Sequence, residues 1–576
     1  MNIEYIRHSF AHLLAAAVLK LRPEAKLGMG PVIENGFYYD FEGVEISEKD
    51  IKTIEQEVRS LASQHLAFKK ELWDKAKAKR FFKDQPFKLE LISDLPAGKV
   101  GIVHTGKAFS DLCRGGHVKN TNELPLKAFS LTRVAGAYWK GDEKRPQLTR
   151  VYGVAFASKE EHSAYLAQMK EAELRDHRRL GRELGLFAFS DLVGPGLPLF
   201  TPKGTRIFRE LQKFSERLKE DIGFHEVHIP HIAKKDLYRV SGHLEKFGED
   251  IFTVKGKDSE FVLKPMNCPH HIQIYASRPR SYRELPFNIY ETTTVYRDER
   301  AGELAGLTRV RSITQDDSHA FLAPEQTEEL FERILKQIQK FVKAFQLTEY
   351  RIRLSLRDEK NPSSYLGDKA TWKKAQTEME RILKRNKIPY VRAEGEAAFY
   401  GPKMDFLAKD SLGREVQIST IQLDLNLPER FSLTYTGAKG EELRPVMIHS
   451  AFLGSIERFL GVLIEHFAGA FPLWLSPEQV WILSVSAKFN SLAAKTAQEL
   501  SALVPGIRVS VRENDETLGK KIREGEVQKI PYLLILGSEE KKAKTVSVRK
   551  RGKGDLGTMK LEVFAARLSK ELDLLK

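Results

Sequence analysis

Two short stretches divide this 576-residue chain into long segments, and they constrain its fold more than any other feature. Residues 194–198 read Gly-Pro-Gly-Leu-Pro, and residues 471–477 combine two prolines with a phenylalanine and a tryptophan. Because glycine and proline interrupt helices and strands, each stretch marks a boundary between folded parts. A chain of this length is expected to form three or four domains.

The composition is that of a globular protein, with 41% hydrophobic and 30% charged residues. No uninterrupted apolar stretch could cross a bilayer, and the first residues carry no apolar signal core, so we expect a cytoplasmic protein without a membrane anchor. The net charge of +15 favours a polyanionic partner, although a well-solvated surface also explains it. Two cysteines, Cys113 and Cys268, allow no disulfide framework.

Hydrophobic periodicity predicts the local structure. Residues 5–21 have helical spacing, and a capping pattern at residues 47–50 opens a charged amphipathic stretch that we expect to run to about residue 83. Residues 89–157 indicate a β-rich part, and residues 158–184 predict a basic helix. Beyond the second boundary, strand-like and helical segments alternate, which is typical of a compact α/β module.

Several short strings together carry a family resemblance. Three of them resemble the signature motifs of class II aminoacyl-tRNA synthetases: residues 200–204 with the helix that follows, residues 295–299 with 309–311, and residues 454–458. Four longer strings are Lys-Pro-Met-Asn-Cys-Pro at 264–269, Thr-Gln-Asp-Asp-Ser-His at 314–319, Ala-Phe-Tyr-Gly-Pro-Lys at 398–403 and Val-Met-Ile-His at 446–449. In order and spacing the chain resembles bacterial-type threonyl-tRNA synthetases over essentially its whole length.

The resemblance implies a chain of the α/β class that is divided into several domains, in the arrangement called multidomain α+β. An α+β editing domain with a connecting helix is expected over residues 1–185, and a class II catalytic domain, an antiparallel sheet with helices, over residues 186–472. An α/β anticodon-binding domain is expected over residues 473–576. The ubiquitin-like domain that commonly precedes the editing domain is expected to be absent, since His8 already lies in the first editing helix. A homodimer is expected through residues 207–230.

The implied function is threonine–tRNA ligation. The enzyme would form threonyl-adenylate from threonine and ATP, transfer threonine to the 3′-terminal adenosine of tRNA(Thr), and hydrolyse mischarged seryl-tRNA(Thr). The alternative is a non-catalytic relative that binds RNA or senses threonine. Against that alternative, every charged catalytic position that the resemblance maps is filled.

The expected catalytic groups suit attack of a carboxylate on the α-phosphate of ATP, because preplaced cations stabilise the concentrated negative charge. By resemblance, Arg297 holds the α-phosphate and the threonine carboxylate, while Arg309 and Arg458 clamp the distal phosphates. Glu299 would accept a hydrogen bond from the adenine amino group. Lys403 and Gln417 match positions that contact phosphate and ribose, and Mg²⁺ is expected with ATP.

Cys268, His319 and His449 are the candidate metal ligands. Their wide separation fits no zinc-finger spacing, and such scattered residues are more often structural. The resemblance implies instead that they bind one Zn²⁺ per subunit and leave a fourth position for the amino group and hydroxyl of threonine. Asp317 would accept from that hydroxyl, and the pocket would be lined by Tyr400, Gln315 and Gln422. A site that requires a hydroxyl rejects valine by roughly 10⁴ or more.

Serine differs from threonine by one methyl group, which gives only about 10–200-fold discrimination, so a second sieve is expected. His8 and His12 share one helix face, and Cys113 and His117 have the same spacing of four. From the residues alone, a closed Cys-His₃ zinc site is slightly favoured over catalysis. The resemblance implies a metal-free editing site instead. Its residues would be His8, His12, Lys88, Asp111, Cys113 and His117, with an imidazole to activate water and a cation to hold the oxyanion.

In the last module, Glu540 and Arg549 match positions that contact anticodon bases, which are readable by side-chain hydrogen bonds. The chain also departs from the family pattern. His270 replaces a usual glycine and would bring another imidazole near the metal. Further departures are Ile313 for a base-stacking aromatic residue, Ile418 for a cysteine, Ser450 for an arginine and Asp515 for an asparagine. These departures bear on kinetics and RNA affinity but remove no catalytic group.

Overall fold

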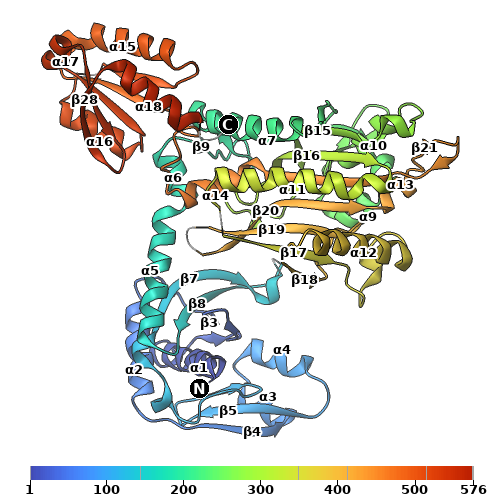
Figure 1. Ribbon diagram of the computed structural model, residues 1–576. Helices are drawn as coiled ribbons and strands as arrows, with labels where there is room; N and C mark the ends of the chain where they lie inside the picture. The colour runs from blue at the N-terminus through green and yellow to red at the C-terminus, as the bar shows by residue number, and fades with distance from the viewer. Residues whose placement is uncertain (1, 143, 348, 411–412, 514, 574–576) are drawn as a thin grey trace. The chain divides into compact units, whose positions relative to one another are not determined.

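The computed structural model describes residues 2–573 apart from 143, 348, 411–412 and 514 (Figure 1). Contacts divide the chain into two compact units, Met1–Glu171 and Ala172–Lys576. Each unit has buried apolar clusters of its own.

The amino-terminal unit is built around helix α1 (Ile3–Leu21), which packs against α2 (Ile51–Ala62) and an antiparallel sheet. That sheet has the order β1-β3-β8-β7, with β2 beside β3. Its strands are β1 (Lys26–Leu27), β2 (Val32–Ile33), β3 (Gly36–Glu42), β7 (Phe129–Tyr138) and β8 (Gln147–Ala155). A second sheet joins β4 (Phe68–Asp74), β5 (Lys99–Thr105) and β6 (Phe109–Leu112), accompanied by α3 (Lys75–Phe81) and α4 (Pro86–Asp94).

Two expectations for local structure are wrong. The amphipathic stretch does not continue from α2 to residue 83, because β4 interrupts it and pairs along its whole length with β5. That strand pairing overrides the helical pattern of its charged residues. The basic helix at 158–184 is also broken. It consists of α5 (Lys159–Arg175) and α6 (His177–Glu183), and the side chain of Asp176 caps the second piece.

The carboxy-terminal unit contains an eight-stranded sheet with the order β11-β15-β16-β23-β20-β19-β17-β18. The pairs from β15 to β17 are antiparallel, and the two edge pairs are parallel. The strands are β11 (His225–Glu226), β15 (Phe287–Tyr296), β16 (Ser312–Leu322), β17 (Tyr350–Leu356), β18 (Tyr390–Glu394), β19 (Lys403–Lys409), β20 (Glu415–Asp424) and β23 (Val446–Ser455).

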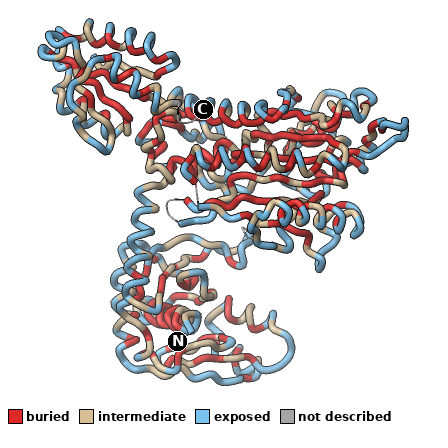
Figure 2. Tube along the Cα trace, viewed as in Figure 1, coloured by how far each residue is buried: buried red, intermediate tan, exposed pale blue. Residues whose placement is uncertain are grey.

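Four helices bury one face of this sheet: α7 (Pro202–Glu220), α11 (Thr327–Ala344), α12 (Lys369–Arg385) and α14 (Ile456–His466). The buried residues of these strands and helices appear red in Figure 2. The same unit also contains smaller elements: β9 (Phe187–Ala188), β10 (Leu199–Phe200), β12 (Ile232–Lys234), α8 (Lys235–Val240), α9 (His243–Phe247), β13 (Thr253–Lys255), β14 (Glu260–Leu263), α10 (Cys268–Ala276), α13 (Asn426–Arg430), β21 (Tyr435–Thr436) and β22 (Glu442–Leu443).

The last part of the chain confirms the expected α/β module. Its sheet has the order β25-β24-β26-β27-β28, formed by β24 (Val480–Ser484), β25 (Val509–Arg512), β26 (Tyr532–Leu536), β27 (Val546–Lys550) and β28 (Gly554–Met559). The helices are α15 (Asn490–Leu503), α16 (Leu518–Val527), α17 (Ser538–Ala543) and α18 (Leu561–Asp573). Separate apolar clusters join α15 with α18 and α16 with Trp481 of β24, so helices cover both faces of the sheet.

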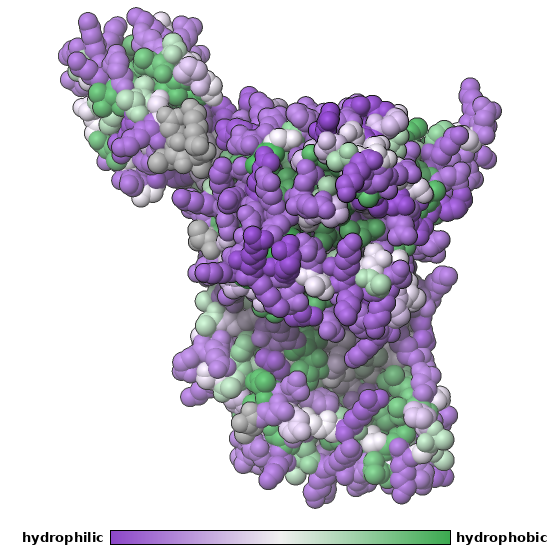
Figure 3. All heavy atoms as spheres, turned by 45° about the vertical axis from the view of Figure 1, so that its right-hand side comes forward, coloured by the Kyte–Doolittle hydropathy of each residue, from purple (hydrophilic) through white to green (hydrophobic). Residues whose placement is uncertain are grey.

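The face shown in Figure 3 is mainly hydrophilic, in keeping with the charged composition. Within the described residues, no helix has both the length and the apolar character of a membrane span.

Candidate active site and editing site

Strand alternation gathers the predicted active-site residues on one face of the large sheet. In β16, Ala320 and Leu322 join the helix-covered core, so Gln315, Asp317 and His319 point to the opposite face. In the neighbouring strands, His319 lies opposite His449, and His449 lies opposite Gln422. Segments far apart in the sequence therefore meet on adjacent strands.

A cavity of about 850 Å³ opens on this face. Ten of the predicted site residues line it: Arg297, Glu299, Arg309, Gln315, Asp317, Tyr400, Gln417, Gln422, His449 and Arg458. Three buried polar atoms of that lining have no hydrogen-bond partner, namely Arg297 Nε, Gln315 Oε1 and Gln422 Oε1. Because buried polar groups are normally hydrogen-bonded, these atoms indicate a polar ligand with both donors and acceptors.

The charged groups of the cavity hold one another in place. Arg309 donates to Glu299 at 2.8 Å and pairs with Glu303 at 2.7 Å, and these contacts raise the pKa of Arg309. Burial lowers the pKa of Arg297, whose guanidinium lies 4.9 Å from the Phe247 ring. Lys403 does not line the cavity; it pairs with Asp405 at 2.7 Å, and that carboxylate also accepts from Gln417 at 3.0 Å.

Cys268, His319 and His449 can offer ligand atoms that all lie within 4.8 Å of one another, and all three are buried. Burial lowers the pKa of His319 well below its ordinary value, which leaves the neutral imidazole that metals bind. Nδ1 of His319 lies 2.7 Å from Nδ1 of His271, and Nε2 of His449 lies 2.9 Å from Asp424. Such outer partners orient the imidazoles of metal sites, so the residues fit a zinc ion.

Two further imidazoles contact this set: Nδ1 of His271 lies 2.7 Å from Nδ1 of His319, and Nε2 of His243 lies 3.5 Å from Sγ of Cys268. Nδ1 of His270 faces the hydroxyl of Tyr238 at 3.4 Å, and His270 is not part of the ligand group. The chain carries the two histidines in tandem, and helical geometry turns the second toward His319. His271 and Asp424 were missed by the sequence analysis, because their roles depend on contacts between distant elements.

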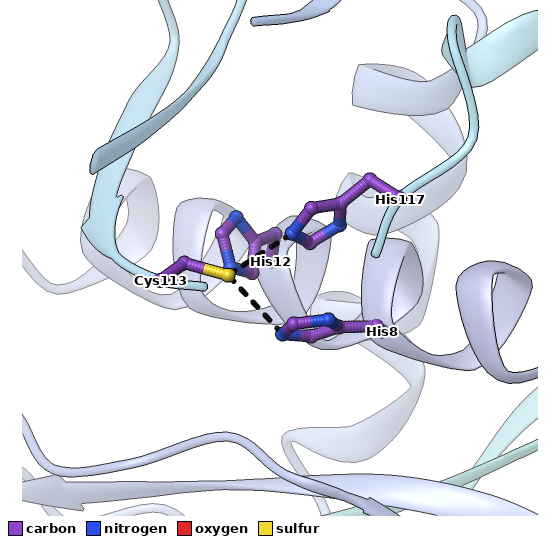
Figure 4. A group of neighbouring side chains, drawn as sticks. All are labelled: His8, His12, Cys113 and His117. Atoms are coloured by element: carbon purple, nitrogen blue, oxygen red, sulfur yellow. Dashed lines mark hydrogen bonds between the residues drawn. The ribbon is translucent and has the colours of Figure 1, made fainter. Parts of the chain in front are cut away.

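The amino-terminal unit brings the four predicted cysteine and histidine residues together (Figure 4). Sγ of Cys113 lies 3.5 Å from Nε2 of His8 and 3.3 Å from Nε2 of His117. The ring of His117 stacks on that of His8 with centroids 4.1 Å apart, and His12 lies at 4.2 Å. This arrangement would also hold a metal ion, so the geometry leaves both interpretations of the cluster open.

Burial keeps the cluster uncharged. It lowers the pKa of His8, lowers that of His12 well below the ordinary value and, with the neighbouring histidines, brings that of His117 to about 2. A cavity of about 500 Å³ reaches the cluster at His8 and is also lined by Tyr5 and Gly116. A neutral imidazole that lines an open cavity can accept a proton from water.

Lys88 and Asp111 form a buried ion pair at 2.5 Å. The hydroxyl of Tyr39 joins the pair, accepting from Lys88 at 2.9 Å and donating to Asp111 at 2.5 Å. Burial raises the pKa of Tyr39 well above its ordinary value, so this hydroxyl stays protonated. The charge of Lys88 also contributes to the lowered pKa of His12, after burial and the charge of His8. Tyr39 is a further residue that the sequence did not reveal.

The two predicted anticodon residues lie in the carboxy-terminal module. Glu540 accepts from the amide of Gly537 at 2.9 Å and so caps α17. Arg549, on β27, lies 3.8 Å from Glu526. Both side chains are half-buried, and neither contact excludes a role toward RNA.

Comparison with known proteins places the chain in a family. Residues 252–467 match the tRNA synthetase class II core domain (G, H, P, S and T), and residues 479–571 match the anticodon binding domain. Residues 100–152 match the threonyl and alanyl tRNA synthetase second additional domain. A threonine–tRNA ligase from Porphyromonas gingivalis is 48% identical over 574 residues, covering 98% of this chain and 87% of the relative. The chain belongs to the threonine–tRNA ligase family.

Other relatives agree with this membership. The threonine–tRNA ligase of Thermus thermophilus is 48% identical over 97% of this chain and 87% of its own length. Among solved structures, the RNA binding domain of threonyl-tRNA synthetase from Cryptosporidium parvum matches 69% of this chain and 98% of its own, with a TM-score of 0.65 and 36% identity. A prolyl-tRNA synthetase from the same organism, at 16% identity and a TM-score of 0.54, shares the fold.

Proposed function

We propose that this ligase activates threonine with ATP in the 850 Å³ cavity and transfers it to tRNA(Thr). The observation that carries the proposal is the sheet face on which a Cys-His₂ ligand set, unpartnered amide oxygens and three arginines converge. Threonine offers an amino group, a hydroxyl and a carboxylate, and ATP offers phosphates and an adenine. The cavity holds a complementary group for each of them.

One group of residues binds threonine and its reacting carboxylate. Cys268, His319 and His449 would hold Zn²⁺, which when bound supplies an open coordination position for the amino group and hydroxyl of threonine. Asp317, which accepts from Asn267 at 3.2 Å, is fixed to accept from that hydroxyl. Arg297 holds the reacting carboxylate and the α-phosphate, and cations placed in advance stabilise the charge that develops there.

The remaining groups bind ATP and close the pocket. Arg309 and Arg458 clamp the distal phosphates, with Mg²⁺ sharing their charge, and Glu299 accepts from adenine. Gln417 contacts ribose. The side chains of Lys403 and Gln417 both donate to Asp405, so Lys403 acts on the site through this carboxylate. Gln315, Tyr400 and Gln422 line the amino-acid pocket.

The full reaction can be tested by charging. With tRNA(Thr), ATP, Mg²⁺ and labelled threonine, the zinc-loaded chain is expected to form threonyl-tRNA only when ATP is present. Valine should be charged about 10⁴-fold less efficiently, because it leaves the hydroxyl-binding groups unpaired. The non-catalytic alternative predicts binding of tRNA without any product, and that result would refute the proposal.

We further propose that the histidine cluster edits seryl-tRNA without a metal. The observations in support are the neutral imidazoles, the open cavity at His8 and the buried Lys88 ammonium held by Asp111 and Tyr39. A neutral His8 can accept a proton from the attacking water, and Lys88 supplies the cation for the oxyanion. His12, Cys113 and His117 hold His8 in place through stacking and contacts to sulfur.

The double variant His8→Ala, His12→Ala tests this editing site. Hydrolysis of seryl-tRNA is expected to slow by about 10²–10⁴-fold, the usual contribution of a general base. Threonine charging should persist, because these residues lie in the amino-terminal unit. The control is His65→Asn, an exchange at an exposed position with positive φ that asparagine tolerates. Deacylation at the parental rate in the double variant would contradict the assignment.

We also infer the domain bounds, the RNA contacts and the assembly of this ligase. The editing, catalytic and anticodon-binding domains occupy residues 1–185, 186–472 and 473–576, in line with the family matches at 100–152, 252–467 and 479–571. Glu540 and Arg549 contact anticodon bases. The enzyme acts in the cytoplasm as a homodimer joined through residues 207–230, which include most of α7.

A further inference from the structure

The loop between β15 and β16 contributes residues to the part of the cavity proposed to bind ATP. It is held by a residue that does not line the cavity. Glu303, Ala305, Thr308 and Arg309 line the cavity, whereas Leu307 between them is fully buried. The amide of Leu307 donates to Nε2 of His177 at 3.0 Å. His177 is buried at the start of α6 and lies outside the set of residues that line the cavity. The acceptor nitrogen Nε2 of His177 therefore fixes the position of this loop.

The other ring nitrogen ties the same imidazole to α14, the helix that carries Arg458. Nδ1 of His177 lies 2.6 Å from Oε1 of Glu465, and the amide of His177 donates to the same oxygen at 3.2 Å. Since Nε2 accepts from an amide, Nδ1 must carry the proton and donate it to the carboxylate. Glu465 also pairs with Arg414. One histidine thus connects the loop of Arg309 with the helix of Arg458.

Packing leaves little freedom at this junction. Gly306 has a φ of +55°, and a Cβ there would lie 2.3 Å from Nε2 of His177. On α14, a Cβ at Gly461 would lie 3.3 Å from Cβ of Leu307 and 3.6 Å from the His177 ring. Loop, ring and helix approach so closely that any larger residue at position 306 would displace the ring.

Asp176, His177 and Glu465 could in principle bind a metal, since their ligand atoms lie within 4.8 Å of one another. However, both ring nitrogens of His177 are engaged within the protein. Asp176 accepts from Arg178 at 2.5 Å, and Glu465 accepts from Arg414. These saturated contacts fit a structural junction better than a metal site.

We propose that His177 is a positioning residue for ATP binding. Its Nε2 accepts a hydrogen bond from the amide of Leu307 and so holds the loop of Arg309 in place beside the helix of Arg458. The inference rests on the proposed ATP site. The inference concerns only the loop of Arg309. Loss of the Nε2 acceptor of His177 should therefore leave the threonine pocket, formed by Asp317 and the metal ligands, unaffected.

Two substitutions distinguish the roles of the two ring nitrogens of His177. The amide nitrogen of asparagine can replace Nδ1 and keep the hydrogen bond to Glu465, whereas the longer glutamine can place an oxygen where Nε2 accepts from Leu307. His177→Asn is expected to raise the KM for ATP about tenfold, because a buried N–H is left unpaired. The KM for threonine should change less than about twofold, since no contact of that pocket is lost. His177→Gln is expected to restore most of the ATP affinity.

Steady-state pyrophosphate exchange, with ATP and threonine varied separately, measures these effects on the zinc-loaded full chain. Active-site titration counts the folded fraction, and His65→Asn is the matched control. Equal losses in both variants, equal rises in the two KM values, or no change in His177→Asn would each overturn the inference. Arg309→Ala tests the underlying ATP site independently: if it leaves the KM for ATP unchanged, the proposed site itself fails.

Discussion

Cys268→Ala is expected to abolish both zinc binding and threonine activation. The thiol is fully buried and is one of only three protein groups that the candidate metal site offers within the described residues. Loss of an outer partner of a metal ligand already costs roughly 10–100-fold in affinity or activity, and loss of the ligand itself should cost more. Zinc content should fall from one ion per chain to none, as measured by elemental analysis of purified protein.

The matched control is Cys113→Ala, because Cys113 is also buried and also lies among histidines. This variant is expected to retain one zinc per chain and full threonine activation. Two zinc ions in the parent chain, or loss of zinc in Cys113→Ala, would contradict the metal-free editing site. In that case the Cys-His₃ cluster would be a zinc site.

Arg297→Ala is expected to reduce the rate of threonyl-adenylate formation by about 10²–10³-fold, as loss of one preorganised donor typically does. Nε of Arg297 is buried and unpartnered, which leaves it available for the proposed contact with the substrates. Arg297→Lys should recover only part of the rate, since lysine keeps the charge but loses the planar fork of donors. Single-turnover quench measurements of adenylate formation separate this step from binding.

Arg300→Ala provides the comparison for Arg297. Arg300 is an exposed arginine three positions away, and the cavity lining does not include it. Adenylate formation in this variant should match the parent. A comparable loss in both variants would mean that the segment, rather than the Arg297 guanidinium, limits the reaction.

The sequence predicts the elements whose signals are local. The alternating module after residue 477 forms as expected, and the strands that carry Asp317, His319 and His449 meet on one sheet face. The family resemblance supplied ten of the residues that line the cavity. For the module after residue 477, local pattern and tertiary structure agree.

What the sequence missed depends on contacts between distant segments. Strand β4 has helix-like charges but becomes a strand because β5 lies beside it. His271, Asp424 and Tyr39 acquire their positions from partners on other elements, and no spacing in the chain indicates those partners. The metal interpretation of the His8 cluster is likewise undecided by spacing, because four donors converge whether they bind zinc or activate water.

Exchange of labelled pyrophosphate into ATP tests the central claim most directly. The assay is run on zinc-replete protein with threonine, serine and valine in parallel, and it needs no tRNA. Threonine should support the fastest exchange, serine should follow within roughly 10–200-fold, and valine should be weaker than threonine by about 10⁴. Absence of threonine-dependent exchange, or equal exchange with valine, would contradict a hydroxyl-selective activation site in this cavity.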